Sequence, residues 1–168
     1  LYVGDGKGKT TAAVGIAVRF AGRFPGKVLF CQFLKARATS EIEPLQHLGI
    51  EVRRAVASEK FFFQLNEEEK AETRRSHADC LTKVASDAKS GTYTLIVLDE
   101  VVDAVNCGAI DAGQLLALLT ERDPQVEVVL TGRNPPEEII AAADYYTEFV
   151  CRKHPYQCGV PARPGIEF

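Results

Sequence analysis

Short apolar runs alternate with longer segments of helical periodicity along this chain. The runs "VLFCQFL" and "TYTLIVLDE" are continuous and rich in β-branched and aromatic residues, which is typical of strands buried on both faces. Apolar positions between the runs recur at helical spacing. The pattern predicts strands at 1–3, 28–34, 92–100, 126–133 and 144–153, with a short segment at 50–54. It predicts helices at 10–23, 40–49, 66–90, 112–122 and 135–143.

Strands that alternate with helices predict an α/β fold with a mostly parallel sheet, right-handed connections and helices on both faces. The chain has 168 residues, which is enough for one domain with a substantial core. Internal repeats, low-complexity tracts and linkers are not seen in the sequence. We therefore expect residues 1–168 to form a single domain.

Composition and charge narrow the function classes. A net charge of -3 and a pI near 5.7 give no electrostatic reason to expect a nucleic-acid or membrane partner. Apolar runs stay well below the ~20 residues that span a bilayer, and no signal peptide precedes the first motif. Five dispersed cysteines without a C-x-x-C pair favour reduced thiols and a cytoplasmic location. The chain lacks methionine and begins on "LYV", so we expect further residues before it.

The segment "GDGKGKTT" (4–11) lies between a predicted strand and a predicted helix and is similar to a phosphate-binding loop. The usual loop has four residues between its glycines, whereas Gly4 and Gly8 enclose three. Backbone N–H groups and the helix N-terminus would hold the phosphates of a nucleotide, and the Thr10 hydroxyl would ligate Mg²⁺. The alternative is a glycine-rich turn without a ligand. The predicted nucleotide-binding residues are Gly4, Asp5, Gly6, Lys7, Gly8, Lys9, Thr10 and Thr11.

Two further sets of polar residues follow predicted strands. Asp99 and Glu100 end the buried run "LIVLDE", where carboxylates hold Mg²⁺ directly or through water; the alternative is a cap on the next helix. Arg133 follows the strand at 126–133 and suits a phosphate or a carboxylate, with simple solvation as an equal alternative. Arg19 lies ten residues after Lys9 and points either to the phosphates or to water.

Three consecutive aromatic residues, Phe61, Phe62 and Phe63, occupy a stretch without regular periodicity. They suit a hydrophobic lid or a wall for a large apolar ligand, although anchoring the loop to the core is the simpler interpretation. His154 before Pro155 is a candidate ligand or base, but a lone histidine is more often structural. No chemical role is predicted for the remaining histidines, His47 and His77.

Taken together, these segments resemble the corrinoid adenosyltransferases that transfer adenosine from ATP to cob(I)alamin. The resemblance covers essentially the whole chain and is carried by "YVGDGKGKTTAAVGIAVR", "VLFCQFLK", "LIVLDEVVDAVNCG", "VVLTGRNPPEEIIAAADYYTE" and "KHPYQCGVPARPGIEF". It implies a P-loop (RecA-like) domain and a shortened loop that binds ATP in the opposite sense to ordinary P-loop enzymes. Co(I) then attacks the ribose C5′, and tripolyphosphate leaves.

The resemblance also implies roles for individual residues. Lys9, Glu100 and Arg19 are assigned to catalysis, Thr10, Glu100 and Asp99 to Mg²⁺, and Arg133 to the nucleotide. Family members displace the lower axial base of cobalamin with an aromatic pair spaced as Phe-x-Trp. Phe61 and Phe63 have this spacing, and Phe63 stands where tryptophan is expected, so we expect an apolar ring to suffice. A one-residue shift would instead assign this role to Phe62.

The same resemblance implies a homodimer and a reduced flavoprotein as electron donor. The segment "DEVVDAVNCG" lacks the tyrosine that many relatives carry after the acidic pair. Two other functions stay open at this point. A P-loop small-molecule kinase would have a full-length loop and release ADP. A regulatory ATPase or nucleotide switch would bind a partner without affinity for corrinoids.

Overall fold

The computed structural model describes residues 1–35, 39–55, 58 and 60–167. Its six strands, in chain order, are β1 (Tyr2–Val3), β2 (Val28–Gln32), β3 (Glu51–Arg54), β4 (Leu95–Asp99), β5 (Glu127–Gly132) and β6 (Thr147–Glu148). The α-helices are α1 (Lys9–Arg23), α2 (Ile42–His47), α3 (Glu67–Ser90), α4 (Val101–Asn106), α5 (Ala112–Glu121) and α6 (Glu137–Ala141). Two 3₁₀ turns are η1 (Phe62–Gln64) and η2 (Pro155–Cys158).

The strands form one parallel sheet in the order β3-β2-β4-β5-β1-β6. The register pairs Gln32 with Asp99 and with Arg54, and Val3 with Gly132. All of these residues lie at the carboxyl ends of their strands. Since ligands of parallel α/β sheets bind beyond these ends, the register brings the predicted polar motifs to one edge. The predicted α/β fold is confirmed.

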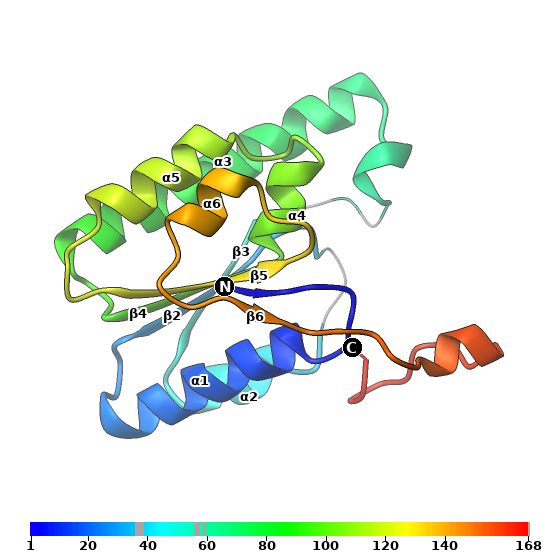
Figure 1. Cartoon of the computed structure of the whole chain (residues 1–168). Coiled ribbons are helices and arrows are strands. Elements are labelled where there is room, and N and C mark those ends of the chain that lie inside the picture. Colours follow the sequence, from blue (N-terminus) through cyan, green and yellow to red (C-terminus); the bar gives the residue numbers. More distant parts are fainter. Residues whose placement is uncertain (36–38, 56–57, 59, 168) are drawn as a thin grey trace.

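Helices cover both faces of the sheet, with α1 and α2 on one side and α3, α4, α5 and α6 on the other (Figure 1). Every residue of the central strands β2 and β4 is buried, as their continuous apolar runs predict. The face under α1 is packed by small residues, including Ala13, Ala17 and Ala21, so this helix lies close to the strands. This close packing fixes the start of α1 relative to the sheet edge.

The long helix α3 begins and ends where its sequence predicts. Asn66 accepts a hydrogen bond from the Glu69 amide, and the Glu69 carboxylate accepts one from the Asn66 amide, which forms a capping box. Gly91 ends the helix in the left-handed conformation, with φ 62°. No helix among the described residues is long and apolar enough to cross a membrane.

Two sequence predictions differ from the structure. The strand predicted at 144–153 is reduced to the two residues of β6, since this segment lies at the sheet edge, pairs only with β1 and leaves Tyr145 and Val150 exposed. Helix α4 was not predicted, because its six residues follow β4 without the turn signal that normally separates elements. The stretch 55–64 is irregular as predicted, apart from η1 and the residues outside the described ranges.

Candidate functional site

A cavity of about 1340 Å³ opens at the carboxyl edge of the sheet. This volume exceeds the ~300–1,000 Å³ of most small-molecule sites. Its walls come from the start of α1, the ends of β2 and β4, the aromatic segment before α3, and the C-terminal segment. The charged, hydroxyl and aromatic side chains that line it include Thr10, Lys35, Phe61, Phe63, Glu100 and Asp103. The cavity therefore joins the first turn of α1, which directly follows the glycine loop, to the aromatic triplet.

The glycine loop is tight because the chain beyond β6 passes against it. The Gly6 amide donates a 2.6 Å hydrogen bond to the Phe149 carbonyl. A Cβ added at Gly4 or Gly6 would lie 2.6 Å from that carbonyl oxygen, and Gly4 has φ 108°. Both positions consequently require glycine. Gly8 then caps α1 with φ 120°, and the first amides of α1 carry no helical hydrogen bond, as at any helix N-terminus.

Lys9 is buried over this loop. Its Nζ donates hydrogen bonds to the carbonyls of Gly4 at 2.6 Å and Gly6 at 3.0 Å. Burial lowers the pKa of Lys9, and the nearby Arg133 acts in the same direction. An ammonium that is already desolvated and held at the loop has little rotamer freedom left to lose on binding an anion.

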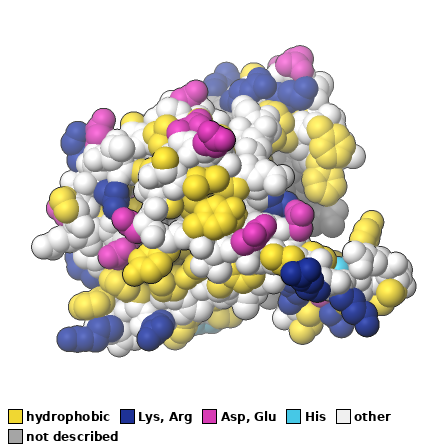
Figure 2. Space-filling view, viewed as in Figure 1, with side chains coloured by type: hydrophobic (Ala, Val, Ile, Leu, Met, Phe, Trp, Pro, Cys, Tyr) yellow, Lys and Arg dark blue, Asp and Glu magenta, His cyan; other side chains and the backbone are white. Residues whose placement is uncertain are grey.

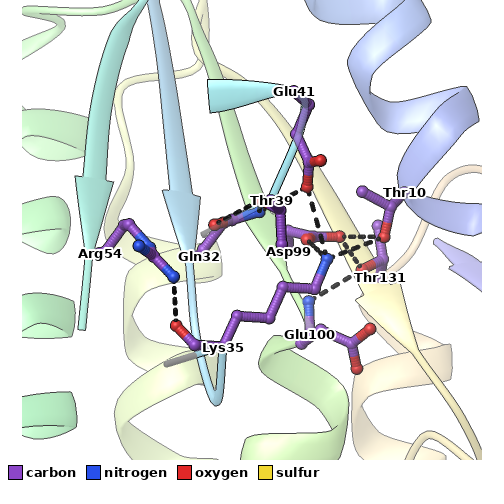
Figure 3. Close-up of polar contacts among 9 residues, drawn as sticks. All are labelled: Thr10, Gln32, Lys35, Thr39, Glu41, Arg54, Asp99, Glu100 and Thr131. Atoms are coloured by element: carbon purple, nitrogen blue, oxygen red, sulfur yellow. Dashed lines mark hydrogen bonds and ion pairs between the residues drawn. The ribbon is translucent and has the colours of Figure 1, made fainter. Parts of the chain in front are cut away.

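The centre of the site is the carboxylate of Asp99, which is fully buried (Figure 3). Its Oδ1 accepts hydrogen bonds from the hydroxyls of Thr10 and Thr131, both at 2.8 Å. Its Oδ2 pairs with Nζ of Lys35 at 2.6 Å. The Glu100 amide in turn donates to Thr131 Oγ1 at 2.9 Å. Asp99 thus ties the ends of β2, β4 and β5 to the first turn of α1.

Lys35 and Thr131 were missed by the sequence analysis. Both lie at or just beyond the end of a predicted strand, on the same sheet edge as Asp99. Polar residues at the carboxyl ends of parallel strands are candidate site residues, and this criterion applies to Lys35 and Thr131 as it does to Asp99. Acidic neighbours, Asp99 above all, outweigh the opposing effect of burial and raise the pKa of Lys35. Lys35 is therefore a fixed positive charge within the site.

Glu100 starts α4 in the left-handed conformation, with φ 62°, a strained geometry for a residue with a side chain. Burial and the adjacent Asp99 carboxylate raise the pKa of Glu100 to about 7. Asp103, one turn further along α4, accepts a hydrogen bond from the Arg133 amide at 3.0 Å. Asp99, Glu100 and Asp103 together concentrate negative charge beside the loop.

The residues present fit a magnesium ion held jointly with a nucleotide. Thr10 donates its only hydroxyl proton to Asp99, so an oxygen lone pair is left for a cation, and Glu100 reaches the same cavity. The described part of the chain holds no group of three His, Cys, Asp or Glu side chains suited to a metal. Mg²⁺ commonly binds one or two carboxylates plus substrate phosphates and water, which this arrangement suits.

The two arginines differ in their placement. Arg133 Nε lies 3.8 Å from Asp5 Oδ1, so its side chain reaches the glycine loop from the end of β5. Arg19 is exposed on α1, about 15 Å along the helix from Lys9, and is not among the residues that line the cavity. The structure places Arg133 at the glycine loop and Arg19 away from the cavity; the nucleotide roles of both stay predictions.

The aromatic triplet divides into two groups. Phe61 and Phe63 stack with ring centroids 5.6 Å apart and an interplanar angle of 7°, and their side chains are 70% and 78% exposed. Hydrophobic side chains project at the right of Figure 2, where η1 lies. Phe62 packs against the core and under the guanidinium of Arg74. The structure therefore separates an exposed aromatic pair from one anchoring ring.

Two histidines have structural contacts. His154 Nδ1 accepts a hydrogen bond from the Tyr156 amide and caps η2, which agrees with the structural alternative. His77 is fully buried on α3, and burial lowers its pKa, which favours the neutral ring. Its Nε2 accepts a hydrogen bond from the Leu34 amide at 3.2 Å. The sequence predicts no role for His77, because the spacing of residues does not indicate this contact.

Comparisons with known proteins agree along the whole chain. Residues 1–168 match the family described as ATP:corrinoid adenosyltransferase BtuR/CobO/CobP. A corrinoid adenosyltransferase of Sinorhizobium sp is 33% identical over 169 residues, which cover 98% of this chain and 77% of that protein. One of Pseudomonas aeruginosa is 32% identical, with coverage of 100% and 82%. Corrinoid adenosyltransferase CobA of Salmonella typhimurium is 30% identical, with coverage of 100% and 84%.

The solved structure of EssC (ATPases 2 and 3) from Geobacillus thermodenitrificans is similar in fold, with a TM-score of 0.50 at 15% identity. The match covers 99% of this chain and 35% of that one. At this identity the likeness concerns the fold alone, and it agrees with the expected RecA-like arrangement.

The raised pKa of Glu100 predicts a specific pH dependence of stability. Between its ordinary value of 4.5 and about 7, the folded protein keeps a proton on Glu100 that the unfolded chain releases. Stability from this group therefore falls as pH rises through that window. Glu100→Gln has no proton to release in this range, so it lacks this loss of stability. The free energy of unfolding of the variant minus that of wild type should therefore rise by roughly 1–3 kcal/mol between about pH 5 and pH 8. Urea unfolding at both pH values measures this difference; a pH-independent difference would contradict the assignment.

Proposed function

The chain belongs to the ATP:corrinoid adenosyltransferase family, and we propose from this premise how its residues carry out the reaction. The enzyme transfers the 5′-deoxyadenosyl group of ATP to the Co(I) centre of a corrinoid and releases tripolyphosphate. The observation that carries the proposal is a cavity that extends from Thr10 and Thr11, at the start of α1, to the exposed pair Phe61 and Phe63. This continuity supports a site in which ATP and the corrinoid bind next to each other.

ATP binds with its phosphates on the glycine loop and the start of α1. Amides of the first helical turn, the ammonium of Lys9 and the guanidinium of Arg133 all lie at this loop. In an ordinary P-loop enzyme such groups act on the terminal phosphate. Here they hold the polyphosphate as a leaving group, so that the ribose C5′ faces the aromatic side of the cavity.

Thr10 and Glu100 would hold Mg²⁺ at the same end of the cavity, with Asp99 behind Thr10. When bound, Mg²⁺ supplies charge neutralisation on the phosphate oxygens. Asp99 acts through Thr10, because its Oδ1 fixes the hydroxyl proton and its Oδ2 is engaged by Lys35. This refines the expectation that Asp99 is itself a ligand.

The reaction needs no general base from the protein. Co(I) is a strong nucleophile, and a substitution at C5′ abstracts no proton. The residues at the loop instead align the substrates and stabilise the charge that grows on tripolyphosphate. The glycine loop suits this task, since the hydrogen bond from Gly6 to Phe149 and the cap at Gly8 fix its backbone before substrates arrive.

The stacked rings of Phe61 and Phe63 form the corrinoid side of the cavity. Their exposure and mutual packing suit the displacement of the lower axial base, since two apolar rings exclude both water and the base from cobalt. Phe62 packs inward and contacts the core, so it holds the segment in place. This division supports Phe61 and Phe63 over the arrangement shifted by one residue.

Three further expectations complete the proposal. We expect a homodimer, a reduced flavoprotein that supplies the electron for Co(II) reduction, and a cytoplasmic location. Arg19 retains its predicted role near the nucleotide. Kinase and regulatory ATPase functions are not favoured, because the family match extends over the whole chain and the loop is one residue short.

The direct test of the reaction mixes the protein with ATP, Mg²⁺ and chemically reduced cob(I)alamin without oxygen. We expect a light-sensitive alkylcobalamin spectrum and one tripolyphosphate for each cobalt–carbon bond. Chromatography of the phosphate products measures the second quantity. ADP and inorganic phosphate without a cobalt–carbon bond would identify an ordinary phosphoryl-transfer enzyme instead.

The aromatic pair predicts a substrate-dependent effect of Phe63→Ala. Starting from Co(II) and a reductant, the variant should lose at least about tenfold more activity on cobalamin than on cobinamide, which lacks the lower base. Phe24→Ala, which removes an exposed ring at the far end of α1, should affect both substrates little. Equal losses for Phe63→Ala on the two substrates would rule out base displacement by this ring.

A further inference from the structure

The turn that follows β2 is held in a strained conformation. Leu34 has φ 57°, a region that residues with side chains rarely adopt. Such strain persists only where surrounding contacts fix the backbone, and it is concentrated at functional sites. The next residue is Lys35, whose ammonium reaches the buried Asp99.

Two side chains from different elements hold this turn. His77 on α3 donates from Nδ1 to the Thr73 carbonyl at 2.8 Å, which leaves Nε2 as the acceptor for the Leu34 amide. Arg54 at the end of β3 donates from Nη2 to the Lys35 carbonyl at 2.6 Å. The backbone on both sides of Lys35 is thus fixed, and the direction of its side chain with it.

The Lys35 ammonium lies beside the Asp99 carboxylate and the Thr10 hydroxyl (Figure 3). Nζ is 2.6 Å from Asp99 Oδ2, 3.4 Å from Thr10 Oγ1 and 3.7 Å from Glu41 Oε1. Thr10 donates its proton to Asp99 and accepts from Lys35, so the ammonium faces a lone pair that a metal would use. A Mg²⁺ ion held by this lone pair would have to share the position that the ammonium faces.

We propose that the Lys35 ammonium occupies the cation position of the Thr10–Asp99 site. Lys35 thereby excludes a divalent metal ion on its own and allows the metal to bind only together with the nucleotide polyphosphate. This inference rests on the proposed magnesium role of Thr10. An ammonium and a divalent metal ion that share one partly buried site repel each other strongly. Polyphosphate offsets this repulsion, because its negatively charged oxygens neutralise both the metal at Thr10 and the Lys35 ammonium, which keeps its ion pair with Asp99. His77 is a positioning residue in this scheme, acting through the Leu34 amide.

The test uses Mn²⁺ alone, without nucleotide, and follows free Mn²⁺ by electron paramagnetic resonance. Lys35→Gln should bind Mn²⁺ at least about tenfold more tightly than wild type, since a positive charge is removed from the cation position. Lys35→Arg retains the charge and should bind as weakly as wild type. Lys89→Gln makes the same change in net charge on the remote end of α3 and should also match wild type. Unchanged Mn²⁺ affinity in Lys35→Gln overturns the proposal.

A second pair of variants tests the positioning role and leaves Lys35 in place. His77→Leu removes the acceptor for the Leu34 amide, whereas His77→Gln retains an acceptor. His77→Leu should show tighter Mn²⁺ binding than wild type, and His77→Gln should restore exclusion; equal Mn²⁺ binding by the two would overturn this role. This pair also covers the case in which Lys35→Gln does not fold because Asp99 loses its partner.

Neither experiment involves a corrinoid, so the outcome is separable from the adenosyl-transfer assay. A protein that forms no cobalt–carbon bond, but whose Lys35→Gln variant gains Mn²⁺ affinity, would refute the reaction and support the cation site. A protein that forms the cobalt–carbon bond, but whose Lys35→Gln variant gains no Mn²⁺ affinity, would support the reaction and overturn the cation site.

Discussion

Burial of the Asp99 carboxylate is the constraint on which the rest of the site depends. Burying an ionised carboxylate that is 0% exposed to solvent costs much free energy unless polar or charged partners compensate it. Here two hydroxyls and one ammonium do so, and they come from α1, β5 and the turn after β2. Loss of any partner leaves a buried charge undercompensated, so the three segments are held in one arrangement. The geometry of Thr10, and with it the phosphate end of the cavity, follows from this arrangement.

The glycine loop is constrained from its other side. Gly4 and Gly6 pack on the Phe149 carbonyl, in the chain that continues from the edge strand β6. The loop is thus held between Asp99, through Thr10, and the backbone beyond β6. A shortened loop fixed on both sides is suited to holding a polyphosphate still while it departs. Fixed placement of the leaving group is what an alkyl transfer to cobalt requires of the protein.

Much of the fold and of the candidate site could be predicted from the sequence. Continuous apolar runs identified β2 and β4 because these strands are buried on both faces, and their ends placed Asp99 and Glu100 correctly. The loop–helix pattern located Thr10 and Lys9. Sequence could not reveal that Asp99 faces Lys35 and Thr131, since this depends on strand order and register. Nor could it find His77, whose contact joins residues 43 positions apart. Helix α4 was missed, and the strand at 144–153 was predicted too long, because local propensity is weak in such brief elements.

The most direct test of this account is the affinity of Asp99→Asn for ATP in the presence of Mg²⁺, measured by titration calorimetry. Asparagine keeps the shape and one acceptor oxygen, but it presents no charge to Lys35 and no longer fixes the site through a full carboxylate. We expect a folded variant whose dissociation constant for ATP rises at least about tenfold. Glu138→Gln on the exposed side of α6 should bind ATP as wild type does. Wild-type ATP affinity in a folded Asp99→Asn protein would contradict the view that this buried carboxylate organises the site.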